Sequence, residues 1–189
     1  MSRYYQFFDD KRGHTQWSLG EFEDENLSIL HQWAVGSRIP DGSVLRLNVI
    51  RHGISTDVTT TAGGFLVLSR KGRDTIWPLA SDDVQLVSAQ IADDGPGSSL
   101  TGASGPWVAV NFLRRPDCLD MDRSKFGGMP GTRRPHDVIV PVVRAEPIGT
   151  AQLFWPKTNR TIMFVSEPFK QAVEKAGLTG ACFKEVQVS

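Results

Sequence analysis

The sequence predicts an α+β fold, mainly antiparallel β-sheet with few helices. Many short apolar stretches are separated by glycine and proline, and this texture favours antiparallel strands. Only one segment, near the C-terminus, has the apolar spacing of an amphipathic helix. The chain has 189 residues, of which 40% are hydrophobic. That is enough for a single domain over residues 1–189, which is compatible with two packed halves that meet near residue 95.

The expected strands begin with the aromatic residues 4–8, because flat rings suit a half-buried pleated surface. Residues 43–50 alternate, with Leu45, Leu47 and Val49 on one face, as in a strand with one buried side. In the closing strand the apolar positions change parity, which predicts a bulge or an early end. The remaining expected strands are residues 65–69, 84–91, 107–113, 137–143, 151–155, 161–165 and 181–188.

The amphipathic helix is expected over about residues 166–176. Apolar residues recur at i, i+3, i+4 and i+7 from Phe169, which places them on one side of a helix. Ser166 precedes this run as an N-cap, and Gly177 follows it as the residue that ends a helix in a left-handed conformation.

A weak internal echo relates residues 65–69 to residues 162–166, since each is an apolar run that ends in serine. After the first copy, Gly72 and Pro78 are expected to shorten any helix. Two related halves and chance similarity both explain the echo.

Charge and hydropathy exclude several classes of protein. Lysine plus arginine equals aspartate plus glutamate at 21 each, which argues against a general nucleic-acid or membrane binder. No apolar run approaches the roughly 20 residues that span a bilayer, and the first ten residues do not resemble a signal peptide. We therefore expect a cytoplasmic protein without direct nucleic-acid or membrane contact. Cys118 and Cys182 are expected to be reduced thiols, partly or wholly buried.

Motifs for catalysis, metal binding or cofactor binding are not evident. The sequence has no phosphate-binding loop, nucleophile elbow or dinucleotide fingerprint, and its four histidines lack metal-ligand spacing. Asp120 and Asp122 resemble the start of a calcium loop. However, Lys125 stands where the turn glycine is needed, and Gly131 where a bidentate glutamate is needed. We expect no metal, no cofactor and no enzymatic activity.

Two glycine-rich loops, residues 93–106 and 121–136, are long enough to be functional. The alternative of an enzyme with an unfamiliar site stays open in the region 117–136, where Asp120, Asp122, Arg133 and His136 could converge.

Acidic side chains and tryptophans are the candidate binding residues. A carboxylate cluster is either a solvated face or a patch that faces a basic partner. Of the five tryptophans, most are expected in the core and one at an interface. The first candidate contact residues are Glu21, Glu23, Asp24, Glu25, Asp93 and Asp94. Asp120 and Asp122 are the second choice.

Several segments, in order along nearly the whole chain, resemble a known family. The most distinctive is Asp117-Cys118-Leu119-Asp120, which is followed by Ser124. The others are residues 17–20, 65–69, 82–87, 107–113, 164–167 and 176–180, then Phe183 and Val186. Together they are similar to an immunity-protein family first defined on a Myxococcus protein and formerly an uncharacterised domain family.

The resemblance implies a non-enzymatic inhibitor of a polymorphic or type VI-delivered bacterial toxin. The expected partner is a cognate toxin, which binds in a one-to-one complex that occludes its active site. Because many such toxins are nucleases, a nuclease domain is the toxin class that we expect first. The family has no assigned catalytic residues, and its shared residues look structural. A nuclease groove is basic, so the acidic candidates would steer association and occupy phosphate subsites. An adaptor or chaperone for a secreted effector is the other alternative.

Overall fold

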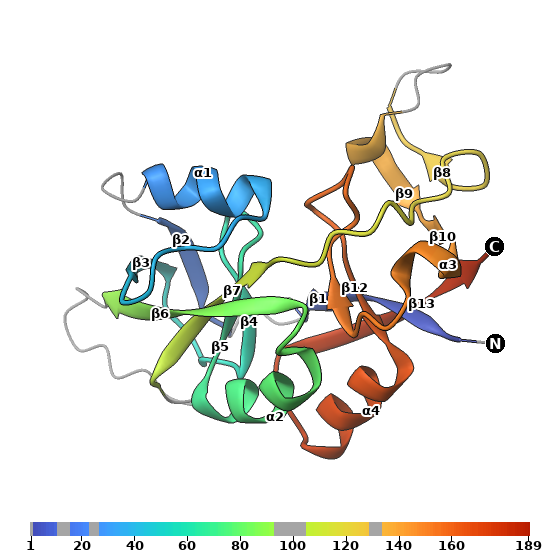
Figure 1. Cartoon of the computed structure of the whole chain (residues 1–189). Coiled ribbons are helices and arrows are strands. Elements are labelled where there is room, and N and C mark those ends of the chain that lie inside the picture. The colour runs from blue at the N-terminus through green and yellow to red at the C-terminus, as the bar shows by residue number, and fades with distance from the viewer. Residues whose placement is uncertain (1, 11–15, 23–26, 93–104, 129–133) are drawn as a thin grey trace.

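The computed structural model describes residues 2–10, 16–22, 27–92, 105–128 and 134–189 (Figure 1). The helices are α1 (Leu27–Val35), α2 (Arg70–Ala80), α3 (Ala145–Ile148) and α4 (Glu167–Lys175), with a short 3-10 helix η2 (Pro135–Asp137). The strands are β1 (Tyr4–Asp9), β2 (Ser18–Phe22), β3 (Val44–Arg51), β4 (Val58–Thr60), β5 (Leu66–Leu68), β6 (Val84–Ala92), β7 (Trp107–Phe112), β8 (Lys125–Phe126), β9 (Val138–Val140), β10 (Val142–Val143), β11 (Leu153–Phe154), β12 (Met163–Ser166) and β13 (Ala181–Val188).

The strands form three sheets. A six-stranded sheet has the order β2-β3-β6-β7-β5-β4, and a five-stranded sheet has the order β10-β13-β1-β12-β11. β8 and β9 form a separate two-stranded sheet. Among these strands only β3–β6 and β10–β13 pair in parallel. The predicted α+β fold with mainly antiparallel sheets is confirmed.

Both faces of the five-stranded sheet are buried, so its strands are apolar at successive positions. In β12, Met163 and Val165 face a core shared with the six-stranded sheet. Phe164, between them, faces a second core under the segment that contains α3. β1 divides in the same way, with Tyr5 on the first core and Tyr4 on the second.

This two-sided burial explains the parity change in β13. Its register with β1 is unbroken, and the strand extends to its predicted end, so the expected bulge or early end is wrong. Phe183 lies opposite Phe7 on the side of the first core, whereas Val186 lies opposite Tyr4 on the side of the second. Apolar residues of both parities are needed because each side of the strand packs against protein.

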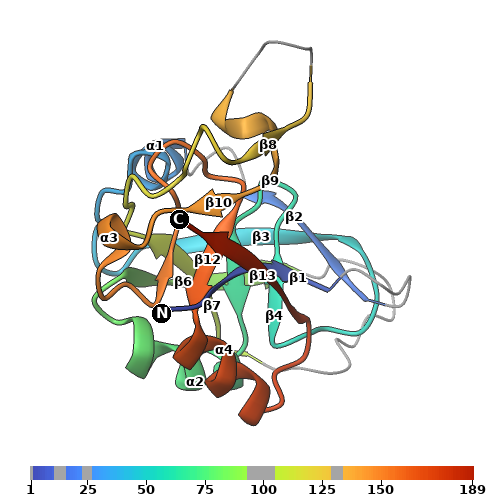
Figure 2. The same cartoon turned by 90° about the vertical axis from the view of Figure 1, so that its right-hand side faces the viewer.

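The six-stranded sheet is covered unevenly. β7 is buried along its whole length. α2 packs on β5 and β7, beside α4 (Figures 1 and 2). The opposite face is covered in part by the segment after α1, where the Gln85 side chain bonds both the N–H and the C=O of Ile39, at 2.8 and 2.7 Å. In β3, Leu45 and Leu47 are buried as predicted, and Val49 is half-buried.

The predicted C-terminal helix is confirmed as α4. The Ser166 hydroxyl accepts from the N–H of Phe169, at 3.3 Å, which satisfies one donor of the first turn. Phe169 and Val173 are buried. Gly177 follows with a φ of 59°, the left-handed conformation expected of a helix stop.

α2 corrects the expectation that Gly72 and Pro78 shorten a helix, since it runs for 11 residues. Gly72 is buried where a Cβ atom would lie 2.7 Å from the Asp57 carbonyl oxygen, so glycine permits a close approach that offsets its poor helix propensity. Pro78 lies in the last turn, and its missing N–H removes only the bond to Asp74. Ser69 caps this helix through a 3.1 Å bond from the N–H of Gly72.

Local sequence did not predict α1, β2 or β4. The C-terminal end of α1 is stabilised by two arginines that lie far away in the sequence. The Arg115 guanidinium donates to the carbonyls of Trp33 and Ala34, and Arg160 donates to the carbonyl of Ala34 at 2.9 Å. These cations also favour a helix C-terminus. The strand expected at 137–143 is divided at Pro141 into β9 and β10.

Within the described ranges, no helix has the length and apolar character to cross a membrane. Cys118 is a buried free thiol, and Cys182 is a half-buried one, which confirms the prediction for the cysteines.

Candidate functional site

Asp83, at the start of β6, is a buried carboxylate that joins the two large sheets. Its Oδ2 atom accepts from the N–H groups of Gln152, at 2.6 Å, and Leu153, at 3.2 Å. Its own carbonyl accepts from Leu113 and Arg114, both at 2.9 Å. Burial raises the pKa of Asp83 in spite of these bonds. The side chain is occupied with backbone donors, so its role is structural.

Asp57 joins β4 to the segment between α4 and β13 in a similar way. Its carboxylate accepts from the Ser69 hydroxyl, at 2.6 Å, and from both the N–H and the hydroxyl of Thr179, at 3.0 Å each. Burial alone would raise the pKa of Asp57, but these hydrogen bonds and the nearby Lys71 outweigh it and lower the pKa. Asp57, like Asp83, therefore has a structural role.

Among the described residues of the region 117–136, Asp120 and His136, which the enzyme alternative would bring together, have other partners. The Asp120 carboxylate accepts from the N–H groups of Asp122, at 3.1 Å, and Arg123, at 3.0 Å, and thereby closes a turn. Hydrogen bonds from Ser189 and from these backbone groups lower the pKa of Asp120. His136 is exposed and lies 3.6 Å from Asp137, whereas Arg133 falls outside the described residues. In the part of the chain that the structure describes, no three His, Cys, Asp or Glu side chains are arranged to hold a metal ion.

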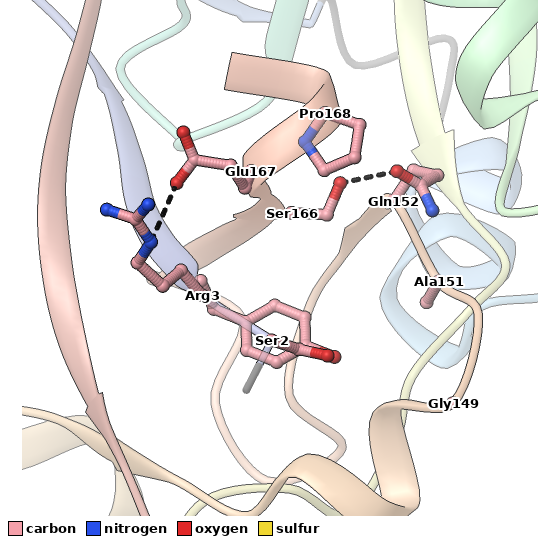
Figure 3. Close-up of a pocket in the computed structure, with 9 residues that line it drawn as sticks. Ser2, Arg3, Gly149, Ala151, Gln152, Ser166, Glu167 and Pro168 are labelled. Atoms are coloured by element: carbon pink, nitrogen blue, oxygen red, sulfur yellow. Dashed lines mark hydrogen bonds and ion pairs between the residues drawn. The ribbon is translucent and has the colours of Figure 1, made fainter. Parts of the chain in front are cut away.

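A polar cavity of about 400 Å³ lies at the start of α4 (Figure 3). Its charged side chains, Arg3 and Glu167, pair with each other at 3.5 Å, and Ser166 donates to Gln152. The Tyr5 hydroxyl donates to Glu167 and lowers the pKa of that carboxyl. These groups are engaged within the protein and do not form a nucleophile with its base.

The remaining candidate is the outward face of β3 and β6, which we call the open face. Its residues point away from the core shared by the sheets, and parallel pairing places Val44 beside Ser88 and Arg46 beside Gln90. All four of these side chains are exposed. Ile50, at the far end of β3, has 59% of its surface exposed. The open face consists of Val44, Arg46, Asn48 and Ile50 of β3 and Ser88 and Gln90 of β6, and Leu86, half-buried against the first core, lies at its border.

A hollow lies at each end of the open face. One, of about 600 Å³, is lined by Arg46, Gln90, Ala92 and Pro106, among others. The second, of about 410 Å³, lies between α2 and β6.

Trp77 lines the second hollow together with Pro78 and Leu86. It is 41% exposed, whereas the other four tryptophans are buried, so the prediction of one exposed tryptophan is confirmed. The sequence did not single out Trp77, because the helix that presents it was expected to be short.

The sheet register bears on the predicted acidic residues. Glu21 lies in β2, where the next residue, Phe22, pairs with Leu47 of β3. On the other side of β3, Ala92 pairs with Asn48. β2 and β6 both end beside the middle of β3, but β2 is antiparallel to β3 and β6 is parallel to it, so the two strands run toward opposite ends of the sheet. The Glu21 side chain and all of Glu23, Asp24, Glu25, Asp93 and Asp94 lie outside what the structure describes.

Asp120 and Asp122 are not part of this group. Their turn is bonded to β10, through the N–H of Asp120 and the carbonyl of Val142 at 2.9 Å, and Leu119 beside it packs into the second core. Asp120 and Asp122 thus lie beside the five-stranded sheet, apart from β2 and β6.

The described part of the chain thus combines carboxylates that are bonded within the fold with an exposed sheet face that is bordered by Trp77. The family of the protein is shown by sequence. A model of the immunity protein family Imm11 matches residues 10–188, so the chain belongs to this family. Membership implies that the protein neutralises a toxin and agrees with the prediction of a non-enzymatic inhibitor. No curated protein matches the chain.

Proposed function

We propose that this protein binds one cognate toxin in a one-to-one complex and occludes its active site with the open face of the six-stranded sheet. The observation that best supports this proposal is the exposure of apolar side chains on the open face. Val44 and Ile50 of β3 are exposed there, although the fold has apolar cores that could bury such side chains. Exposed apolar residues grouped on one face are typical of protein interfaces. A stable complex would cover about 800 Å² of this protein.

A nuclease is the toxin class that we favour. The two acidic segments, residues 21–25 and 93–94, begin at the ends of β2 and β6, the two strands that pair with β3 of the open face. A nuclease must bind phosphates through a basic groove, so carboxylates beside the open face would speed association and compete with the nucleic acid. The toxin would be a polymorphic or type VI-delivered effector that acts in the cytoplasm, the compartment in which we expect this protein.

The test is a titration of purified toxin with this protein, with nuclease activity as the readout. We expect activity to fall linearly to zero at one equivalent. Loss of activity at far less than one equivalent would contradict stoichiometric inhibition.

Charge reversal tests the acidic segments. Reversing Glu21, Asp93 and Asp94 to lysine is expected to slow association at least tenfold at low salt. Asp122→Lys, on the other sheet, is the matched control and is expected to change it less than twofold. Equal effects of the two changes would contradict the proposed contact between the acidic segments and the toxin.

The adaptor alternative makes a different prediction in the same titration, since a chaperone would bind the effector and leave its activity intact. The single-domain organisation, with two halves that meet near residue 95, remains a prediction alongside these.

A further inference from the structure

The outer side of α2 carries a stripe of residues that the fold does not require. Arg70, Arg73 and Trp77 are spaced at i, i+3 and i+7, so they lie along one side of the helix. We call these three residues the α2 stripe. Trp77 is 41% exposed and lines the hollow of about 410 Å³, together with Arg73, Asp74, Pro78 and Leu86.

The charges of α2 oppose its own helix dipole. Its first turn contains no acidic residue and carries Arg70, Lys71 and Arg73, whereas the N-terminal end of a helix favours negative charge. Lys71 has a structural role, since its ammonium donates to the Gly177 carbonyl at 2.9 Å and lies 4.0 Å from Asp57. Helix stability does not account for the two arginines.

The two arginines are available to a partner. Two guanidinium nitrogens of Arg73 contact the same Asp74 oxygen, at 2.8 and 2.7 Å, which fixes the group beside the hollow and leaves other N–H donors free of that carboxylate. Arg70 is exposed and, among the described residues, takes part in no ion pair or hydrogen bond. Arginine and tryptophan are the residues that most often dominate binding energy at protein interfaces.

We propose that the α2 stripe is an anchor for an acidic segment of the cognate toxin that also carries an apolar side chain. The carboxylates would meet Arg70 and Arg73, and the apolar side chain would enter the hollow against Trp77 and Leu86. This inference rests on the proposed function and adds a second contact to it, at the end of the open face that lies beside α2.

Charge complementarity favours an acidic partner over a second copy of this chain. A symmetric dimer through α2 would place the same cations of both copies against each other, which is unfavourable for isologous contacts.

Isothermal titration calorimetry of the purified toxin with the full chain tests the anchor, and the readout is the Kd rather than inhibition. We expect Trp77→Ala to weaken binding about 30-fold or more, as for an interface hot spot. Arg70→Glu with Arg73→Glu is expected to weaken binding at least tenfold and to make the Kd less sensitive to salt. Trp77→Phe is expected to recover most of the affinity.

Matched controls lie on the β8–β9 side of the molecule. Ile139→Ala removes a side chain that is 62% exposed, and Arg123→Glu reverses an exposed arginine there. Both are expected to bind within twofold of the unchanged protein. Arg70→Glu alone, at an exposed position without a partner among the described residues, keeps the test valid if Trp77→Ala lowers the Tm.

Wild-type affinity in the Trp77 and arginine variants, with an unchanged protein that still inhibits at one equivalent, would overturn the anchor and leave the proposed function in place. Failure of the unchanged protein to bind the toxin would instead overturn the proposed function. A dimer that sediments as such and is lost in Trp77→Ala would show that a second copy covers the stripe, which also overturns the anchor.

Discussion

The five-stranded sheet and the open face show two ways in which a β-strand uses apolar residues. In β12 all four residues are buried, because one core lies on each side of the strand. In β3 the inward Leu45 and Leu47 are fully buried, whereas Val44 and Ile50 point outward and are exposed. The folded chain accounts for every apolar residue of β12 but not for the outward ones of β3. This difference is the reason that we propose the open face, and not the five-stranded sheet, as the surface for a partner.

The largest difference between the two regions is expected in core truncation. Phe154 of β11 is fully buried and contacts Tyr4 and Phe164, with ring centroids 6.1 and 5.8 Å apart. Phe154→Ala is expected to lower the free energy of unfolding by about 3–5 kcal/mol. Val44→Ala on the open face is expected to change it by less than about 0.5 kcal/mol. Urea denaturation measures both, and equal losses would show that the open face is covered within the protein.

Asp57 and Asp83 should respond to acid in opposite directions. The pKa of Asp57 is lowered in the folded protein, so its contribution is present at neutral pH and is lost as the pH falls through the folded pKa, below about 4. The pKa of Asp83 is raised, so its contribution is greatest in acid and is lost as the pH rises from about 4 through the folded pKa.

Asparagine variants measured by urea denaturation at several pH values separate these two contributions. Asp57→Asn is expected to cost about 1–3 kcal/mol at neutral pH, because it replaces an acceptor of several hydrogen bonds, and to lose less stability in acid than the unchanged protein does. The deficit of Asp83→Asn is expected to shrink as the pH rises above about 4. Parallel curves for the two variants would contradict these assignments.

The two helix caps should differ by a smaller amount. Ser166→Ala is expected to lower the free energy of unfolding by about 1 kcal/mol, as for a typical N-cap. Ser69→Ala is expected to cost more, since the Ser69 hydroxyl also donates to the buried carboxylate of Asp57, whereas that of Ser166 donates to the neutral amide of Gln152. Thermal unfolding of both variants, with serine-to-threonine changes as controls, measures the difference. A larger loss at Ser166 would contradict the role given to Ser69.

The cysteines should differ in reactivity without a change in stability. Burial raises the pKa of the Cys118 thiol to about 12, so a disulfide reagent is expected to modify it only when the protein unfolds. Cys182, half-buried on β13, is expected to react first. Mass spectrometry of partly labelled protein identifies the modified residue, and early labelling of Cys118 would show that the second core opens readily.

The sequence predicted most strands and α4, because these depend on local patterns such as the alternation of β3 and the cap at Ser166. It did not predict α1, whose end is held by Arg115 and Arg160, since bonds over such separations leave no local pattern. The bulge expected in β13 was wrong for a related reason. Parity indicates a bulge only when one side of a strand is buried, and whether the second side is covered depends on tertiary packing.

The candidate site was predictable only in part. The sequence identified acidic clusters and expected one exposed tryptophan, but not which tryptophan. It treated Gly72 as a residue that weakens α2, whereas Gly72 allows the helix to approach Asp57. The alternation of residues 43–50 predicted that Val44 lies on the unburied side of β3, but not that β6 continues this face, because the pairing of β3 with β6 is set by tertiary structure.

The position of β1 has a consequence for when protection begins. This strand lies at the centre of its sheet, between β12 and β13, and its Tyr5 bonds Glu167, which is 162 positions away. Translation at about 5–20 residues per second separates the two by roughly 10–30 s. All strands of the six-stranded sheet emerge before β12, so β1 waits longest for its neighbours. Because β1 needs β12 and β13 beside it, only a completed chain can neutralise the toxin. The cell therefore needs a supply of finished protein before the toxin arrives.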